Sequence, residues 1–329
     1  MLYRNILKQS LRITWRNKYL WFFGLFAALI TGEGQVLIHE FGNNSSQSFL
    51  EGLKNFAETG IFSSNALENI GILLKSDFVA MTILFIVGLI ILILLAFLLW
   101  LSVISQVALI KESANIIINK IKTKSSGIKN GIIGSANKFW PVFGLNLIIK
   151  IAIFTIFILI NLPIIFTVAN SNFSANLLYV ILFVFFMPVA IIFSFIIKYG
   201  ICFIVIKNNS FLDSIKNGWN LFANNWLVSI EVSFVLFFIN FFAGLGAILL
   251  IVILSIPFLF LILLFYELMS LAGSLVMIFL SLIVFLFIIM AVGSGLTVFQ
   301  TASWTGLFIK LADGGIESKI MRIVGKFRK

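Results

Sequence analysis

The sequence alternates long apolar runs with shorter polar or charged segments. A membrane-spanning α-helix needs about 20 apolar residues in succession, and most of the runs exceed that length. The six runs cover residues 19–31, 78–110, 141–168, 177–206, 226–254 and 274–309. The pattern predicts an all-α polytopic membrane bundle that forms one membrane domain, residues 1–329, with six transmembrane helices of which the first is short.

Residues 255–272 are also apolar, and they follow directly on the fifth run. A seventh span there would move the basic tail, residues 310–329, to the external side, against the positive-inside rule. The alternatives are an extension of the fifth span, broken near Pro257, or a re-entrant or interfacial segment. Pro257 favours a break because proline lacks the backbone N–H that a continuous helix requires.

Charges between the runs predict the orientation of the chain, because cytoplasmic loops of membrane proteins carry an excess of lysine and arginine. Cations outnumber acids in residues 1–18, 111–140, 207–225 and 310–329. Residues 32–77 instead carry six acids against two lysines, so we expect them to form an external loop. Six spans then alternate without conflict, and both termini lie in the cytoplasm.

Composition agrees with a membrane protein, since 61% of the residues are hydrophobic and only 11% are charged. The net charge of +11 would suggest nucleic acid in a soluble protein, but here the cations lie beside apolar runs. We therefore predict no nucleic-acid partner. The expected partners are the lipid bilayer, with anionic lipid headgroups on the cytoplasmic face, and a membrane protein.

A short motif recurs ahead of the odd-numbered spans. Residues 17–25 read NKYLWFFGL, residues 137–145 read NKFWPVFGL, and residues 224–230 hold a weaker copy, NNWLVSI. The tetrapeptide IKNG precedes the second and third copies by the same distance, at residues 128–131 and 215–218. The spacing predicts a threefold parallel repeat of an interfacial helix, an outward span, an external loop and an inward span. Convergent bias is the alternative, because membrane proteins place lysine and aromatic residues at this interface in any case.

Residues 1–18 have the pattern of an amphipathic helix that lies in the headgroup plane. A cation recurs at every fourth position, beside a neighbouring ridge of Tyr3, Leu7, Leu11 and Trp15, which is typical of interfacial helices. The predicted membrane-interface anchors are Arg4, Lys8, Arg12, Arg16, Lys18, Trp15, Trp21, Lys138, Trp140 and Trp226.

Two more interfacial helices are predicted ahead of the third and fifth spans. The one within residues 111–140 is rich in glycine and weaker. The one within residues 207–225 begins at a capping box formed by Ser210 and Asp213. Its predicted apolar side consists of Phe211, Leu212, Ile215, Trp219 and Phe222.

The stretches ILKQSLRITWRNKYLWFFGLFAALITG near the N-terminus and FQTASWTGLFIKLADGG at the end of the last span resemble an uncharacterised family of bacterial six-helix inner-membrane proteins. That family is similar to the membrane domain found ahead of the catalytic domain in some glycerophosphodiester phosphodiesterases. The resemblance implies a six-helix membrane domain. Only 19 residues follow Lys310, so we expect no phosphodiesterase domain here and do not carry that activity over.

Residue types that carry catalysis or bind metals are scarce. The one cysteine, Cys202, lies in an apolar run and cannot form an intrachain disulfide. The one histidine, His39, is followed by EFGNN and lacks the second histidine of an HExxH zinc motif. We therefore predict no catalytic residue, no cofactor and no metal site, and we expect the chain not to be an enzyme.

Two ionisable residues fall inside predicted spans, where charged side chains are costly and often functional. Lys150 lies in the third span and Glu231 in the fifth, at comparable depths. They are either interfacial side chains that reach the headgroups or an intramembrane polar pair between these two spans.

The function that these observations favour is a non-enzymatic membrane scaffold or accessory module that engages lipids or partner proteins. The alternative is a small-molecule or lipid transporter or channel, with a polar site between the third and fifth spans. Its path would be lined by Asn146, Asn161, Asn240 and Gln300. A membrane-embedded enzyme is the third and least supported hypothesis.

Overall fold

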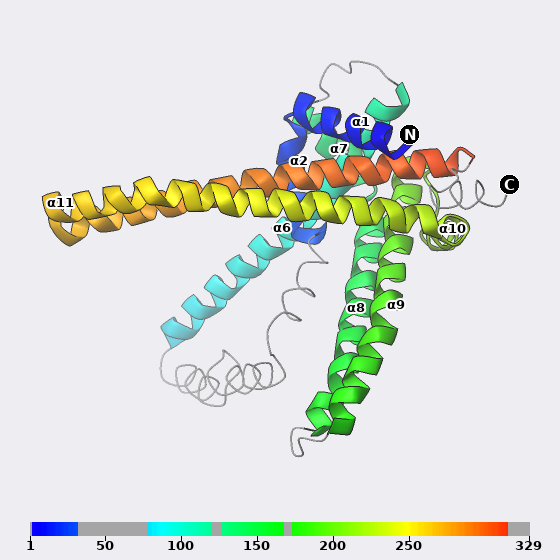
Figure 1. Ribbon diagram of the computed structural model, residues 1–329, viewed down its shortest axis with the longest axis horizontal. Coiled ribbons are helices and arrows are strands. Elements are labelled where there is room, and N and C mark those ends of the chain that lie inside the picture. Colours follow the sequence, from blue (N-terminus) through cyan, green and yellow to red (C-terminus); the bar gives the residue numbers. More distant parts are fainter. Residues whose placement is uncertain (1, 32–77, 120–126, 168–172, 315–329) are drawn as a thin grey trace. The chain divides into compact units, whose positions relative to one another are not determined.

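A computed structural model describes residues 2–31, 78–119, 127–167 and 173–314 (Figure 1). Every regular element within these ranges is an α-helix, which confirms the all-α class. The predicted external loop, residues 32–77, lies outside the described residues. The helices are α1 (Leu2–Arg16), α2 (Leu20–Thr31), α6 (Phe78–Asn119), α7 (Gly127–Ala136), α8 (Phe139–Thr167), α9 (Phe173–Ile206), α10 (Phe211–Asn224) and α11 (Trp226–Ala312).

Several helical segments are long and apolar enough to cross a bilayer, so the chain is a multi-pass membrane protein. Five such segments are found among the described residues: Thr82–Ile118, Phe139–Ile156, Val180–Ile206, Trp226–Glu267 and Gly273–Ala312. The remaining predicted span corresponds to α2, whose 12 residues reach only about 18 Å at the usual rise of an α-helix. That length falls short of the roughly 30 Å hydrocarbon core, so a full crossing by α2 stays a prediction.

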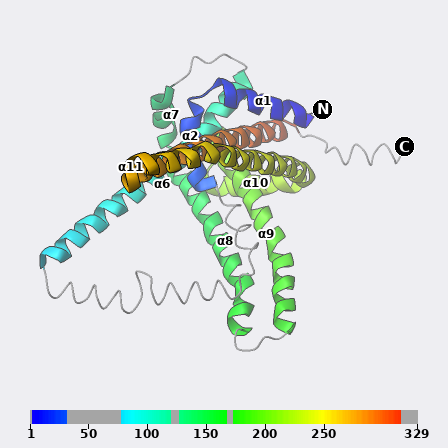
Figure 2. The same ribbon diagram turned by 60° about the vertical axis from the view of Figure 1, so that its left-hand side comes forward.

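Helix α11 doubles back on itself to form a hairpin (Figures 1 and 2). We call Trp226–Glu267 its first arm and Gly273–Ala312 its second arm. The rings of Phe258 in the first arm and Phe285 in the second lie with their centroids 5.5 Å apart. A straight helix would separate these residues by about 40 Å, so the arms run antiparallel.

The predicted break near Pro257 is wrong, because α11 remains helical on both sides of this residue. A proline inside a helix removes only one backbone hydrogen bond, and membrane helices tolerate that loss when neighbouring helices support the segment. The ring contact between Phe258 and Phe285 packs this segment against the second arm. Residues 255–267 therefore continue the first arm.

The described helices belong to two compact units. The first unit comprises Met1–Leu29, Ser102–Asn146 and Phe195–Lys329, and the second comprises Ile30–Leu101 and Leu147–Ser194. Within the second unit, the segments of α8 and α9 that belong to it run antiparallel and side by side (Figures 1 and 2).

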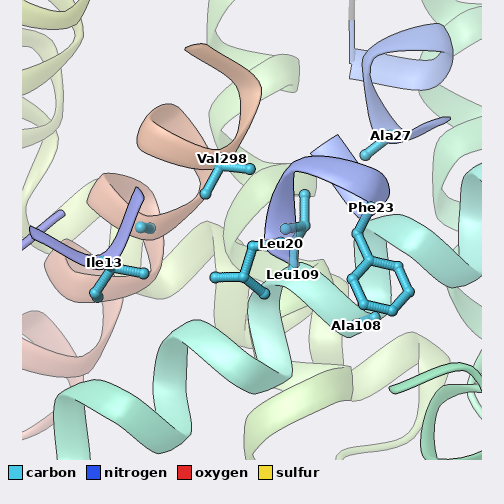
Figure 3. Close-up of a cluster of buried hydrophobic side chains, with 8 residues drawn as sticks. Ile13, Leu20, Phe23, Ala27, Ala108, Leu109 and Val298 are labelled. Atoms are coloured by element: carbon cyan, nitrogen blue, oxygen red, sulfur yellow. The ribbon is translucent and has the colours of Figure 1, made fainter. Parts of the chain in front are cut away.

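The core of the first unit forms where α1, α2, α6 and the second arm of α11 pack together. Its buried cluster consists of Ile13, Leu20, Phe23, Ala27, Ala108, Leu109, Val298 and Ala302 (Figure 3). Small residues such as Ala27, Ala108 and Ala302 allow helix backbones to approach closely, as is usual in membrane proteins. Helix α6 also continues past Ile110, the predicted end of its span, to Asn119. Ser113 and Ala114 in this continuation are buried in the first unit.

Candidate functional site

Helix α1 carries three distinct faces. Ile6, Ser10 and Ile13 are almost fully buried, and α1 packs against α11. Leu11 and Trp15, on the predicted apolar ridge, are 51% and 62% exposed. The four cations of the neighbouring ridge, at positions 4, 8, 12 and 16, are exposed as well.

The buried face of α1 was not predicted from the sequence. Its available signal was a row of small hydroxyl residues, Ser10 and Thr14, beside Ile6 and Ile13. Both hydroxyls donate to carbonyls one turn earlier, Ser10 to Ile6 and Thr14 to Ser10, each at 2.9 Å. Their polar atoms are thereby satisfied, so this face can pack against another helix without an unpaired polar group.

A short turn, residues 17–19, joins α1 to α2, and we call such a turn between two helices an elbow. The backbone N–H groups of Leu20 and Trp21 donate to the carbonyls of Asn17 and Lys18 at 2.9 and 3.0 Å. The indole Nε1 of Trp21 donates to the Thr14 carbonyl at 2.9 Å, which satisfies one of the free carbonyls at the end of α1. Trp21, predicted as an interface anchor, therefore holds the elbow, whereas Lys18 is exposed.

The second and third elbows, which join α7 to α8 and α10 to α11, share the same backbone hydrogen bonds. Lys138 N–H donates to the Ser135 carbonyl at 3.1 Å, and Asn225 N–H donates to the Phe222 carbonyl at 3.0 Å. One turn later, Val142 and Ser229 donate to the carbonyls of residues 138 and 225 at 3.3 and 3.1 Å. Each pair of equivalent positions differs by 87 in residue number, as do the two IKNG motifs.

Exposed tryptophans mark the starts of the helices that follow these two elbows. Trp140 of α8 is 76% exposed and Trp226 of α11 is 53% exposed. Both were predicted as interface anchors, and exposure is compatible with that role because indole rings favour the headgroup level. Lys138, between α7 and α8, is half-buried.

Helix α10 begins at the predicted cap. The Asp213 N–H donates to the Ser210 hydroxyl, and that hydroxyl donates to the Asp213 carboxylate at 2.6 Å. Before the cap, Asn208 adopts a left-handed conformation with φ 56°, which asparagine tolerates better than most residues. This turn lets α9 pass directly into α10.

The predicted apolar side of α10 is divided between two surroundings. Phe222 is buried with Ser214 and Gly218, whereas Leu212 and Trp219 are 75% and 52% exposed. The residues predicted to form one apolar side of α10 therefore do not share one environment. Helix α10, like α1, uses one face for packing and leaves another face exposed.

Two glycines of the first unit allow the backbones of neighbouring helices to approach closely. A Cβ atom placed on Gly218 of α10 would lie 2.6 Å from the Ile196 carbonyl oxygen and 3.1 Å from the backbone nitrogen of Gly200, both in α9. A Cβ on Gly24 of α2 would lie 2.5 Å from the carbonyl oxygen of Ser294, in the second arm of α11. Only glycine fits at such separations.

Polar side chains of the first unit form pairs that join different helices. Asn146 Nδ2 of α8 donates to Gln106 Oε1 of α6 at 2.7 Å, and both residues are buried. The hydroxyls of Tyr199 and Ser229 lie 2.7 Å apart and link α9 to the first arm of α11. These contacts are used in packing, so Asn146 is engaged rather than open to a transport path.

The other residues proposed for such a path are in varied surroundings. The side-chain oxygen of Asn240 is buried without a hydrogen-bond partner, and Gln300 is half-buried. The Asn161 side chain lies outside the described residues. Lys150 is exposed and belongs to the second unit, whereas Glu231 is half-buried and belongs to the first. Their pairing stays a prediction.

Helix α6 also contacts the first elbow through a buried carboxylate. The Tyr19 hydroxyl donates to Glu112 Oε2 at 3.1 Å, and Glu112 is only 8% exposed. Hydrogen bonds between neutral donors and carboxylates contribute more than those between neutral partners. The contact therefore helps to fix the elbow on α6.

We expect Tyr19→Phe to lower the free energy of unfolding by about 1–2 kcal/mol, because Glu112 then loses its phenolic donor while remaining buried. Thermal unfolding of the purified protein in mild detergent would measure this loss. The matched control is Tyr266→Phe at an exposed position of the first arm, which should change nothing. Equal losses in the two variants would show that the contact with Glu112 contributes no stability.

Within the described ranges, no three His, Cys, Asp or Glu side chains gather as a possible metal site. Cys202 is a free, buried thiol of α9. His39 lies outside the described residues. Comparison with protein-family models, curated proteins and solved structures finds no match to this chain.

Proposed function

We propose that this protein is a non-enzymatic scaffold or accessory module of the bacterial inner membrane, which engages lipids or partner proteins from the cytoplasmic face. In this proposal α2 is the first of six spans, both termini are cytoplasmic, and the family resemblance of the two terminal stretches reflects common ancestry. Helices α1, α7 and α10 lie at the headgroup level, and the hairpin of α11 supplies the last two spans.

The observation that carries the proposal is the division of faces on α1 and α10. Each helix is held by one buried face and exposes a tryptophan and a bulky aliphatic residue on another, Trp15 with Leu11 and Trp219 with Leu212. Tryptophan and leucine on an exposed helical face are suited to the boundary between headgroups and acyl chains. A protein with several such helices presents an extended binding surface to lipids or to a membrane protein.

A threefold parallel repeat is part of this proposal. The shared hydrogen bonds of the second and third elbows support it, because their positions differ by the same 87 residues as the IKNG motifs. A common ancestor explains equal spacing of both sequence and backbone contacts better than interface composition alone. The first elbow has the same order of interfacial helix, short turn and apolar helix.

Cysteine accessibility tests the orientation. In a Cys202→Ser background, Ser45→Cys should react with a membrane-impermeant maleimide in intact cells, whereas Ser125→Cys should react only after the membrane is opened. This outcome follows from the acidic and basic segments in which the two positions lie. Labelling of both positions from the same side would refute the six-span arrangement.

Co-purification in mild detergent, with mass spectrometry of bound lipids and proteins, tests the scaffold role. We expect defined partners that are lost in a Leu212→Ala/Trp219→Ala variant but retained in a Leu249→Ala variant of the exposed first arm. Partners that are retained equally by both variants would contradict a role for the elbow helices. Solute uptake into proteoliposomes that requires Lys150 and Glu231 would instead favour the transporter.

A further inference from the structure

The exposed faces of α1 and α10 differ in charge. Helix α1 carries four cations, at positions 4, 8, 12 and 16, and no acid. Helix α10 carries one acid, Asp213, and one cation, Lys216, so its charges cancel. Both helices nevertheless expose a tryptophan and a leucine. The difference between them is therefore a row of cations beside an otherwise similar apolar surface.

The cation row of α1 has a regular geometry. Its members lie four residues apart, so they follow one another at about 6 Å along one side of the helix. All four side chains are exposed, and none of them forms an ion pair with another residue in the described part of the chain. The opposite face of α1 is buried against α11, so this packing holds the helix in place while the cations remain exposed.

Leu11 and Trp15 complete this surface on the adjoining ridge of α1. Cations beside exposed apolar side chains match a lipid that has a phosphate near its acyl chains. A soluble polyanion would be bound by the cations but would leave the tryptophan and leucine in water. Charge complementarity and the adjoining apolar ridge therefore favour one occupant, an anionic phospholipid.

We propose that the cation row of α1, with Leu11 and Trp15, is a binding surface for anionic phospholipids of the cytoplasmic leaflet. Helix α10 is an anchor of the same shape without selectivity for charge. The proposal rests on the cytoplasmic placement of α1 in the proposed function. It assigns lipid selectivity to one interfacial helix, not to the net charge of the whole protein.

Quenching of tryptophan fluorescence by brominated lipids tests the assignment site by site. The protein is reconstituted in nanodiscs of phosphatidylcholine and phosphatidylglycerol, with bromine on one lipid or the other. The contribution of Trp15 is the difference between the unmodified protein and Trp15→Phe, and that of Trp219 is obtained in the same way. We expect brominated phosphatidylglycerol to quench Trp15 more strongly than brominated phosphatidylcholine, and the two lipids to quench Trp219 equally.

The charge variant is Arg4→Gln/Lys8→Gln/Arg12→Gln/Arg16→Gln. Each surface cation contributes roughly fivefold to anionic-membrane affinity, so removing all four should abolish the preference for phosphatidylglycerol at Trp15. Raised salt should weaken the preference of the unmodified protein. Replacing the three arginines by lysine keeps the charge and should keep the preference. If the preference for phosphatidylglycerol is lost in the glutamine variant but kept in the lysine variant, positive charge alone accounts for it.

Equal quenching of Trp15 by both lipids in the unmodified protein would overturn the proposal, and so would an equal preference at Trp15 and Trp219. Maleimide labelling of an Asn5→Cys variant in the Cys202→Ser background separates this failure from that of the proposed function. Labelling of intact cells would place α1 outside and refute the orientation. Protection of Asn5→Cys combined with equal quenching would refute the lipid assignment alone.

Discussion

Gly218→Ala is expected to destabilise the protein strongly, by forcing α10 away from α9. The new Cβ would lie 2.6 Å from the Ile196 carbonyl oxygen and 3.1 Å from the Gly200 nitrogen. Both neighbours are backbone atoms of α9, so neither can move aside by changing a rotamer. Overpacking of this kind costs about 1–3 kcal/mol and occasionally more. The measurement is the midpoint of thermal unfolding in detergent, followed by size-exclusion chromatography of the heated sample.

The matched control is Gly244→Ala, in the first arm of α11. A Cβ at Gly244 meets no atom within 4 Å, and alanine has the higher helix propensity by about 1 kcal/mol. This variant should therefore be as stable as the unmodified protein or more so. If both variants were equally stable, α10 would not cross α9 at Gly218 as closely as the structure indicates.

Asn146→Leu is expected to produce the second large effect. The substitution removes the Asn146 amide, which donates to Gln106 Oε1 at 2.7 Å. The Gln106 amide is then buried without this partner. An unsatisfied buried polar group costs about 1–3 kcal/mol, although interhelical hydrogen bonds in membrane proteins average nearer 0.6 kcal/mol. We expect a loss of about 1–2 kcal/mol in the free energy of unfolding.

The double variant Asn146→Leu/Gln106→Leu separates the hydrogen bond from the packing. Replacing both partners by apolar residues of similar size removes the unpaired amide, so the double variant should be more stable than the sum of the single losses predicts. A double-mutant cycle would show a coupling of about 0.5–2 kcal/mol between the two positions. Strictly additive losses would mean that the amides do not interact in the membrane.

The sequence predicted the elements of this protein better than their contacts. The elbows lie where the NKYLW and NKFWP motifs place them, because the change from an amphipathic to an apolar pattern is a local property of the sequence. The Ser210 cap was likewise readable from residues close in sequence. Pro257 was misread because the cost of an interior proline depends on neighbours that are distant in the chain.

The candidate site was predicted only in part. The cation row and Trp15 of α1 follow from the recurrence of cations and of large apolar residues at every fourth position, which is a local property. The buried face of α1 could not be predicted from neighbouring residues, because Ile6, Ser10 and Ile13 resemble in type other residues that remain exposed. The partner of Asn146 could not be foreseen either, because Gln106 lies 40 residues away.

By itself the sequence determined the membrane class, the helical elements and the charge pattern that predicts their orientation, since all three depend on the transfer of residues from water to lipid. Only the tertiary structure decided which apolar residues are buried. In α6, residues 101–110 are buried while residues 82–100 are exposed or half-buried, although both segments are apolar. Lipid tails are as apolar as leucine, so hydrophobicity cannot distinguish a lipid-facing side chain from a packed one. Shape and hydrogen bonding make that distinction, at Gly218 and at the Asn146–Gln106 pair.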